Sequence, residues 1–393
     1  MRILIAHESI ATTGGVESYL GAILPELQER GHQIAVVYHR RRDRAGSGTW
    51  AGCADFVAGI EDTSEASVLQ AVRRWRPDVC FSHNMRPLEV ERALLAEWPV
   101  VKMMHGYFGT CASGLKMHAF PSTRACDRAL GAACLAMYVP RHCGQLHPRS
   151  LVSGYRWALA QKSLLSRYRS IAVASAHMGA EYARHGVPSS QINVLPLFPT
   201  LDGSSKRADG GAVLFAGRMT TLKGGDLLVN AVADASRRLG RSVPLIMAGD
   251  GPQRSAWAGQ AASRGVNAEF TGWLDRAGLA AVFQQASMVV IPSVWPEPFG
   301  LVGLEAGAMG LPAIAFDVGG IREWLRPGQN GVLVPPERGT DGLADAIVSM
   351  YSHASVRGRM SITAHAVATE MSRSVHADRL ERVLGSAGEP PTQ

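Results

Sequence analysis

Short apolar segments alternate with longer segments of helical periodicity along almost the whole chain. In the first half, the apolar segments predict β-strands at residues 2–6, 33–38, 79–82, 100–104, 171–174 and 192–197. In the second half, they predict strands at residues 213–216, 244–248, 269–271, 288–291, 313–316 and 331–334. Periodic segments between the later strands predict helices at residues 225–239, 253–264, 276–284, 299–310 and 341–352. Such alternation is typical of parallel sheets covered by helices.

The series of strands stops and restarts at a polar segment, residues 199–211, which we interpret as a linker. A chain of 393 residues also exceeds what one hydrophobic core usually serves. The sequence therefore predicts an α/β protein with two doubly wound, Rossmann-like domains, at residues 1–200 and 201–373. Ligands of such folds bind at the carboxyl ends of the strands, so we expect both sets of strand ends to face one central cleft.

The net charge of +7 lies in the first half, where residues 1–200 hold 22 Lys and Arg against 15 Asp and Glu. The cationic clusters are Arg40, Arg41, Arg42 and Arg44, and then Arg73, Arg74 and Arg76. They could attract an anionic membrane face or a phosphorylated acceptor, although a solvated surface is the favoured interpretation. The apolar segment at residues 3–6 is too short for a signal peptide, and no apolar segment reaches about 18 residues. We therefore expect a cytoplasmic protein that can lie peripherally on the inner membrane surface.

Two carboxylates, Glu297 and Glu305, lie in an otherwise apolar, glycine-rich segment at residues 292–310. The helix expected at residues 299–310 is apolar on nearly all sides, which indicates that Glu305 is buried with it. A buried carboxylate needs hydrogen-bond donors, and a ribose diol offers two. The alternative is structural: Glu297 complements the helix dipole, and Glu305 pairs with a core arginine or a backbone donor.

Two cations, Arg218 and Lys223, follow the first strand of the second domain. A guanidinium and an ammonium that converge across a loop are suited to a diphosphate. Charge-assisted bonds of roughly 1.5–3 kcal/mol each would give such a pair about 3–6 kcal/mol. The alternative is an arginine at a strand end beside a solvated lysine.

Glycine-rich turns follow other predicted strands. Gly249, Gly251 and Pro252 form one such turn, and Gly14 and Gly15 separate the first strand of the chain from its helix. Glycine lets a backbone approach a ligand closely, but a simple tight turn explains each of these positions equally well.

Taken together, these motifs resemble the nucleotide-sugar-dependent glycosyltransferases of the GT-B fold, specifically glycosyltransferase family 4. The Glu-x7-Glu pattern of that family is matched by Glu297 and Glu305. Its Gly-Arg-x4-Lys-Gly element is matched at residues 217–224, its Gly-x-Gly-Pro turn at 249–252, and its Gly-Gly-Val-Glu segment at 14–17. The family's usual Asn-Gly after the last strand of the first domain is absent, because Leu197-Phe198-Pro199 stands there.

The resemblance implies retaining transfer of a sugar from a nucleoside diphosphate sugar to an acceptor hydroxyl. Glu305 would hold the ribose, and Glu297 would hold sugar hydroxyls together with the backbone N–H groups of Phe299, Gly300 and Leu301. Arg218 and Lys223 would neutralise the departing diphosphate. Gly14, Gly15, Gly249, Gly251 and Pro252 would approach the donor. His105 would contact the donor sugar, the alternative being a core or capping histidine, and a C-terminal helix at residues 374–393 would return to the first domain.

The resemblance further implies a UDP- or GDP-sugar as co-substrate and no metal cofactor, since side-chain cations and helix dipoles take the leaving-group charge. The sequence contains no Asp-x-Asp pair. Retention would follow a same-face route in which the leaving phosphate helps to deprotonate the acceptor. An inverting enzyme would instead need a general base, for which the candidates are His7, Glu8, Glu17 and His105.

The expected acceptor is a saccharide or a lipid-linked saccharide in bacterial exopolysaccharide, lipopolysaccharide or lipid-linked glycan biosynthesis, and no nucleic-acid partner is expected. Two rival interpretations stay open. One is a GT-B-fold nucleotide-sugar epimerase, which would need acid and base groups aimed at the sugar ring. The other is a catalytically silent nucleotide-binding subunit of a glycan assembly complex.

A weakly patterned insertion at about residues 106–150 contains four cysteines, Cys111, Cys126, Cys134 and Cys143. A structural zinc site is one interpretation, since several histidines lie nearby. The absence of any Cys-x2-Cys pair makes free thiols the favoured interpretation over zinc or disulfides. Loops of this kind often carry recognition, so we expect the insertion to contact the acceptor.

Overall fold

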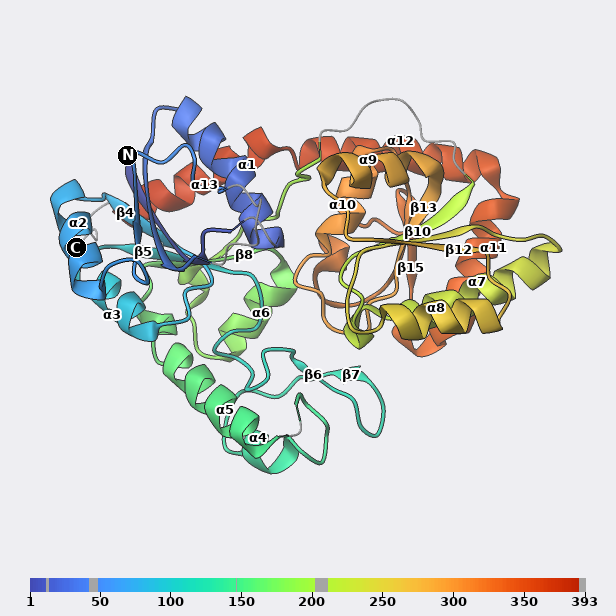
Figure 1. The fold of residues 1–393 in the computed structure, drawn as a ribbon, viewed down its shortest axis with the longest axis horizontal. Coiled ribbons are helices and arrows are strands. Elements are labelled where there is room, and N and C mark those ends of the chain that lie inside the picture. The colour runs from blue at the N-terminus through green and yellow to red at the C-terminus, as the bar shows by residue number, and fades with distance from the viewer. Residues whose placement is uncertain (12–13, 42–48, 146, 202–210, 389–393) are drawn as a thin grey trace. The chain divides into compact units, whose positions relative to one another are not determined.

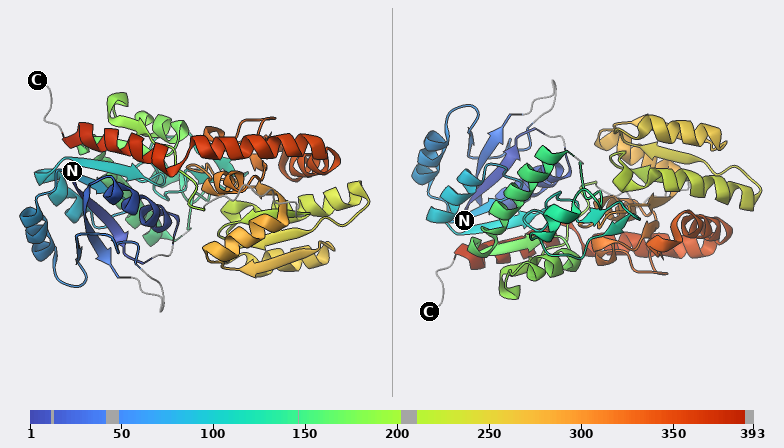
Figure 2. Two further views of the ribbon diagram at one scale, coloured as in Figure 1. Left: turned by 90° about the horizontal axis from the view of Figure 1, so that it is seen from above. Right: turned by 90° about the horizontal axis from the view of Figure 1, so that it is seen from below.

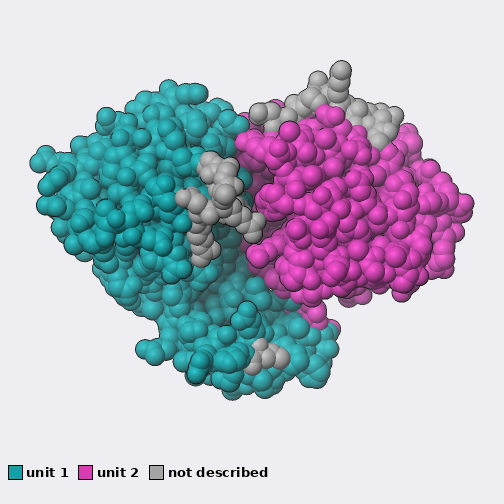
Figure 3. All heavy atoms as spheres, in the orientation of Figure 1, with its two compact units in different colours: residues 1–122, 126–196, 373–393 teal, residues 123–125, 197–372 magenta. Residues whose placement is uncertain are grey.

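The computed structural model describes residues 1–11, 14–41, 49–145, 147–201 and 211–388 (Figure 1). Arg42, Arg44 and most of the expected linker lie outside these residues. The chain divides into two compact units, coloured separately in Figure 3. Unit 1 comprises Met1–Ser122, Cys126–Pro196 and Arg373–Gln393, and unit 2 comprises Thr123–Ala125 and Leu197–Ser372.

Unit 1 is built on a seven-stranded sheet in the order β3-β2-β1-β4-β5-β8-β9, with all neighbours parallel. The strands are β1 (Arg2–Ser9), β2 (Gln33–Arg40), β3 (Phe56–Gly59), β4 (Val79–Ser82), β5 (Val100–Met104), β8 (Ser170–Val173) and β9 (Ile192–Val194). The helices are α1 (Gly15–Glu29), α2 (Glu65–Trp75), α3 (Leu88–Glu97), α4 (Ala133–Met137), α5 (Pro148–Lys162), α6 (Ala176–Arg184) and α13 (Arg373–Gly388). Strands β4, β5 and β8 are buried along their whole length, as expected for a sheet covered on both faces.

The C-terminal helix α13 belongs to unit 1, where it packs on α1, β4 and β5. The two views in Figure 2 show it lying along this unit. Several polar contacts tie α13 to α1 and to Arg30 at its C-terminus. The Tyr19 hydroxyl lies 2.9 Å from Nε2 of His376, and the Arg30 guanidinium reaches Glu381 at 2.9 Å.

Unit 2 is built on a six-stranded parallel sheet in the order β12-β11-β10-β13-β14-β15. The strands are β10 (Ala212–Ala216), β11 (Leu245–Ala248), β12 (Ala268–Gly272), β13 (Ala286–Ile291), β14 (Ala313–Phe316) and β15 (Gly331–Val334). The helices are α7 (Gly225–Leu239), α8 (Arg254–Ser263), α9 (Arg276–Gln285), α10 (Leu301–Ala308), α11 (Gly339–Ser352) and α12 (Ala354–Glu370). In Figure 1 this sheet separates α9, α10 and α12 from α7, α8 and α11.

These two sheets confirm the expectation of two doubly wound, Rossmann-like domains, with three corrections in detail. Strand β3 was not expected, because it is an edge strand in which only Gly59 is buried, so it leaves no apolar run in the sequence. Strand β9 ends at Val194 instead of residue 197. Helix α10 spans Leu301–Ala308 instead of residues 299–310, because Gly300 adopts a left-handed conformation and caps it.

Both sheets reverse their winding at one point. In unit 1 the chain starts at β1 and winds outward through β2 and β3, then returns to the other side of β1 with β4. Unit 2 repeats this arrangement, with β10 and β13 in the places of β1 and β4. Doubly wound sheets bind their ligands at the carboxyl ends of the strands beside such a switch point. The switch points therefore direct attention to the loops that follow β1 and β4, and β10 and β13.

Candidate active site

The loops that carry the predicted site residues of unit 2 are hydrogen-bonded to one another. The backbone N–H of Met219, after β10, donates to Asp250, after β11, at 2.8 Å. On the other side, the N–H of Val294, after β13, donates to Leu222 at 2.9 Å. Because these strands are neighbours in the sheet, the glycine-rich and charged turns form one continuous edge at the switch point.

Gly249 and Gly251 are required by the packing of this edge. Their φ angles are 131° and 153°, and a Cβ atom at Gly249 would lie 2.0 Å from the carbonyl oxygen of Gly217. At Gly251 a Cβ atom would lie 2.4 Å from the carbonyl oxygen of Met219. Tight loop packing therefore explains both glycines without a ligand, and Pro252 beside them is exposed. Their part in donor binding stays a prediction.

Lys223 and Glu297 form an ion pair across the switch point, with 2.6 Å between Nζ and Oε1. Glu297 is 4% exposed, and the Ser293 hydroxyl donates to the same carboxylate oxygen. The side chain of Lys223 is 29% exposed, and its ammonium lies 5.6 Å from the centre of the Trp295 ring. Glu297 is thus a nearly buried carboxylate whose cationic partner still reaches solvent.

Arg218 does not share this arrangement. Its side chain is exposed and has no ionic partner among the residues that the structure describes. Among the described residues, no carboxylate is shared by Arg218 and Lys223. Lys223 pairs with Glu297, and the expected convergence of the two cations on a diphosphate stays a prediction.

Glu305 lies on α10, one side of which is buried against the sheet. The Thr200 hydroxyl donates to its Oε1 at 2.6 Å. Burial raises the pKa of Glu305, while the Thr200 hydrogen bonds and the charge of Arg276 oppose that shift. The carboxylate therefore has a hydroxyl donor within the protein, and its part in ribose binding stays a prediction.

The N-terminus of α10 adjoins the ion pair in sequence. Phe299 is buried, and its carbonyl accepts a hydrogen bond of 2.7 Å from the Trp324 indole, which fixes the turn before the helix. Gly300 is the N-cap, and Leu301 is the first helical residue. The first N–H groups of a helix have no acceptor within it, so this turn can bind an electron-rich ligand.

At the switch point of unit 1, histidines end three neighbouring strands. His7 lies near the end of β1, and His83 and His105 directly follow β4 and β5. Nδ1 of His83 lies 2.9 Å from Nε2 of His105, and the two rings stack with centroids 5.2 Å apart. Burial, followed by the charges of His7 and Lys102, lowers the pKa of His105 to about 3. Both rings are therefore neutral at physiological pH.

The remaining predicted residues of unit 1 lie at the start of α1 and at the end of β1. Gly14 is the N-cap of α1 and Gly15 its first residue, and a side chain at Gly15 would meet no atom within 4 Å. In α1, Oε1 of Glu17 accepts a hydrogen bond from Nε2 of His7 at 3.1 Å. Glu8, another candidate base, contacts Nδ1 of His39 at 3.1 Å.

The sequence analysis did not predict two features near the switch point of unit 1. One is His83, whose signal is a polar residue directly after a predicted strand. The other is a buried ion pair between Lys102 and Glu91, with 2.5 Å between Nζ and Oε1. Its signal is a lysine in the middle of an otherwise apolar strand, Val100–Met104.

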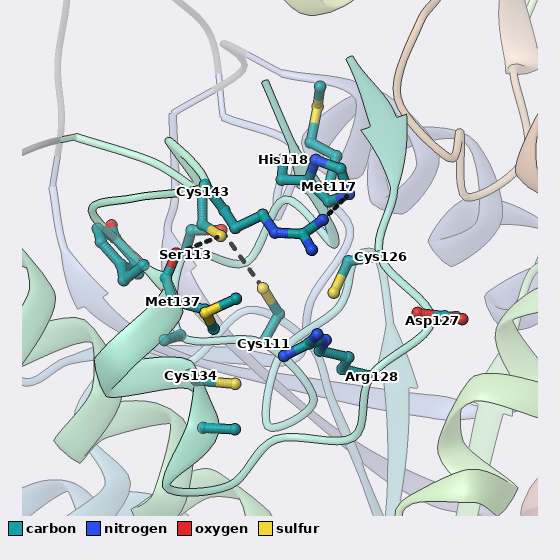
Figure 4. A pocket seen from close by; sticks show the side chains of 14 residues that line it. Cys111, Ser113, Met117, His118, Cys126, Asp127, Arg128, Cys134, Met137 and Cys143 are labelled. Atoms are coloured by element: carbon teal, nitrogen blue, oxygen red, sulfur yellow. Dashed lines mark hydrogen bonds between the residues drawn. The ribbon is translucent and has the colours of Figure 1, made fainter. Parts of the chain in front are cut away.

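The four cysteines of the insertion line one pocket of about 200 Å³ (Figure 4). All four thiols are free, and burial, then the other three thiols, raise the pKa of Cys143 to about 11. Among the described residues, no group of three or more His, Cys, Asp or Glu side chains is arranged to hold a metal ion. The insertion is anchored to α6 through Glu181, which pairs with Lys116 at 2.5 Å.

Two doubly wound sheets, each with its candidate residues at the switch point, define the GT-B class of glycosyltransferase fold. HepE from Anabaena, solved with UDP-glucose, superimposes with a TM-score of 0.72 over 98% of this chain and all of its own, at 19% identity. WaaG, a glycosyltransferase involved in lipopolysaccharide biosynthesis, gives a TM-score of 0.69 over 97% of this chain and 99% of its own, at 15% identity.

The sequence matches the family model described as Glycosyltransferase Family 4 over residues 13–198 and that described as Glycosyl transferases group 1 over residues 210–353. The chain belongs to glycosyltransferase family 4. It is 32% identical over 183 residues to the alpha-D-kanosaminyltransferase of Streptomyces kanamyceticus, which covers 46% of this chain and 47% of that protein. It is also 32% identical over 197 residues to the D-inositol 3-phosphate glycosyltransferase of Kribbella flavida, covering 46% of each. The match thus spans less than half the length of these curated relatives.

No helix in the described part of the chain combines the length and apolar character that a bilayer span requires.

Proposed function

We propose that this protein transfers a sugar from a nucleoside diphosphate sugar to an acceptor hydroxyl, with retention and without a metal cofactor. The observation that carries this proposal is the ion pair between Lys223 and Glu297 at the switch point of unit 2. It places a nearly buried carboxylate and a partly exposed cation where a doubly wound sheet binds its ligand.

The two side chains divide the donor between them in this proposal. The Lys223 ammonium has three hydrogens, so it can keep its contact with Glu297 while it donates to a phosphate oxygen. Glu297 has a second carboxylate oxygen that can accept from sugar hydroxyls, and the N–H groups of Phe299, Gly300 and Leu301 lie next to it in sequence. As the bond to the sugar breaks, negative charge grows on the diphosphate, and the Lys223 contact strengthens. Arg218, with an exposed side chain, would swing onto the same diphosphate.

We assign the ribose to Glu305. Its carboxylate is partly buried with Thr200 as donor, and a ribose diol would supply further donors of the kind that a desolvated carboxylate requires. In this proposal Gly14 and Gly15 bring the start of α1 to the phosphates.

The donor is proposed to be a UDP- or GDP-sugar, with UDP favoured because HepE was solved with UDP and with UDP-glucose. The acceptor is proposed to be a saccharide or lipid-linked saccharide of bacterial exopolysaccharide, lipopolysaccharide or lipid-linked glycan biosynthesis. The likeness to WaaG favours this setting. We assign acceptor contact to the insertion and a cytoplasmic, membrane-peripheral location to the protein.

A panel of UDP- and GDP-sugars tests the proposal, with thermal stabilisation and slow hydrolysis of the donor as readouts. We expect one sugar nucleotide to stabilise the protein and to be hydrolysed. In Glu297→Gln, thermal stabilisation should no longer differ from one sugar to another. Release of an epimerised donor would favour the epimerase interpretation, and stabilisation without hydrolysis or transfer would favour a silent subunit. A protein that responds to no sugar nucleotide would overturn the proposal.

A further inference from the structure

The rings of His83 and His105 are joined by one hydrogen bond. Nδ1 of His83 and Nε2 of His105 are 2.9 Å apart, so one nitrogen donates and the other accepts. His83 is fully buried, and its other nitrogen, Nε2, has no partner among the described residues. His105 is only partly buried, so its Nδ1 is the nitrogen of the pair that a ligand can reach.

The direction of the shared hydrogen bond follows from that orphaned nitrogen. If His105 donated, Nε2 of His83 would carry a buried N–H group without an acceptor. If His83 donates, its Nε2 carries only a lone pair without a donor. Orphaned buried N–H groups are the rarer and more costly of the two. His83 is therefore the donor, and the remaining proton of neutral His105 must lie on Nδ1.

We propose that His83 is a positioning residue that fixes His105 in its Nδ1–H tautomer, so that His105 donates a hydrogen bond to a hydroxyl of the donor sugar. This inference rests on the proposed function for the identity of the ligand. The tautomer itself is a property of the free protein.

The surroundings of His83 hold this arrangement in place. The ammonium of Lys102 donates to the backbone carbonyl of His83 and is itself paired with Glu91 at 2.5 Å. The Tyr19 ring packs against both imidazoles, with centroids 6.0 Å from each. Phe81 packs edge-on against His83 at 4.3 Å.

Neither His83 nor His105 gains a second ring proton near neutral pH, so the neutral tautomer persists. The charged or titratable groups that act on the pair are His7 and Lys102, and both disfavour a second positive charge. Burial acts in the same direction and is the largest cause of the lowered pKa of each ring. A neutral His105 with its lone pair committed to His83 can donate but cannot accept a proton, which removes it from the candidate general bases.

Nitrogen NMR of the free protein tests the tautomer without any ligand. We expect Nδ1 of His105 to give a pyrrole-type signal and Nε2 a pyridine-type signal, unchanged between about pH 5 and 8. The reverse pattern, or an imidazolium signal at neutral pH, would overturn the inference. This result does not depend on whether the protein binds a sugar nucleotide, so it separates this inference from the proposed function.

Three substitutions at His83 then test its positioning role. His83→Asn keeps an amide N–H near the place of Nδ1 and should retain the tautomer, whereas His83→Phe removes the donor and should let Nε2–H of His105 appear. His83→Asp offers only an acceptor and should reverse the tautomer. If an altered protein does not fold, the wild-type spectrum still decides the tautomer.

The same variants link the tautomer to the donor sugar. In His83→Phe we expect the Kd for the sugar nucleotide to rise by about three- to tenfold, the loss of one neutral hydrogen bond. The Kd for the nucleoside diphosphate alone should not change, and His83→Asn should resemble the wild type. An equal loss for the nucleoside diphosphate would show that His105 meets a phosphate, and an unchanged Kd in His83→Phe would refute the positioning role.

Discussion

Each unit places one Lys–Glu ion pair beside its switch point, yet the two pairs differ in burial. In unit 1, the side chains of Lys102 and Glu91 are 3% and 0% exposed. In unit 2, those of Lys223 and Glu297 are 29% and 5% exposed. The distances are almost equal, at 2.5 and 2.6 Å, so geometry alone does not distinguish them.

The other hydrogen-bond partners of these side chains do distinguish the two ion pairs. Besides Glu91, Lys102 donates to the Ser82 hydroxyl at 3.1 Å and to the carbonyl of His83. Glu91 accepts from Tyr168 and Ser82 as well, so the groups of this pair are satisfied within the protein. Lys223 has Glu297 and the face of Trp295 as partners, and its side chain is 29% exposed. A satisfied, buried pair holds the fold, whereas a pair with an open cation can exchange water for a ligand.

Breaking the buried pair should therefore give the largest effect on stability. Lys102→Met leaves Glu91 as a buried charge without its cation, which costs about 3–5 kcal/mol in comparable cases. The measurement is urea unfolding of the purified variant near neutral pH. As a control, Lys102→Met combined with Glu91→Gln should recover much of the loss, since no charge is then left unpaired. A single variant as stable as the wild type would contradict a structural role.

Breaking the open pair should affect turnover before stability. Lys223→Met removes one charge-assisted contact to the leaving diphosphate, which should lower kcat/KM for transfer or donor hydrolysis by roughly ten- to hundredfold. The free energy of unfolding should fall less than in Lys102→Met, because the side chains of Lys223 and Glu297 are 29% and 5% exposed, against 3% and 0% for Lys102 and Glu91.

Arg238→Met is the matched control for Lys223→Met, since Arg238 forms an exposed ion pair with Asp345 in the same unit. Its activity should equal that of the wild type. Equal activity of Lys223→Met and Arg238→Met would remove Lys223 from the site.

The sequence predicted this contrast only in part. The strand positions, both parallel sheets and the turns at the switch point of unit 2 follow from apolar runs and glycines, which are local signals. Edge strand β3 left no such signal, because only Gly59 of its four residues is buried. The ion pair of Lys223 with Glu297 joins residues 74 positions apart, so it depends on the order of strands in the sheet.

The histidine pair was out of reach for a similar reason. His105 was singled out by resemblance, but its partner His83 lies 22 residues earlier and is adjacent only because β4 and β5 are neighbours. Likewise, Glu305 was expected to need donors, and Thr200, 105 residues away, could not be named from the sequence.

A smaller effect on stability should distinguish a glycine in the packed loops of unit 2 from a glycine at an ordinary helix position. Gly249→Ala would place a Cβ atom 2.0 Å from a backbone oxygen at a φ of 131°, so we expect a loss of about 1–3 kcal/mol in urea unfolding. Gly259 in α8 is the control, because a Cβ atom there meets nothing within 4 Å. Gly259→Ala should leave stability unchanged or raise it by up to about 1 kcal/mol. Similar values for both variants would show that the edge tolerates movement.

The smallest effect concerns pH, to which buried groups of the two units should respond with opposite sign. In unit 1, burial lowers the pKa of His376 to about 4 from 6.5, so below about pH 6.5 the unfolded chain binds a proton that the folded chain refuses. The free energy of unfolding therefore falls as the pH drops toward 4, by at most roughly 1.4 kcal/mol per pH unit for this group. In unit 2, the raised pKa of Glu305 lets the folded chain take up a proton first, which opposes that loss.

Urea unfolding of His376→Gln at several pH values measures this difference. Neutral His376 bonds Tyr19 at 2.9 Å and the carbonyl of Pro196 at 2.7 Å, so the variant should be less stable at pH 7. Its loss of stability on acidification should nevertheless be shallower than that of the wild type, because one proton-binding group is gone from the unfolded chain. His353→Gln, at an exposed position, should leave a larger part of the slope in place. A slope in His376→Gln as steep as in the wild type would mean that the buried histidine does not govern the acid response of unit 1.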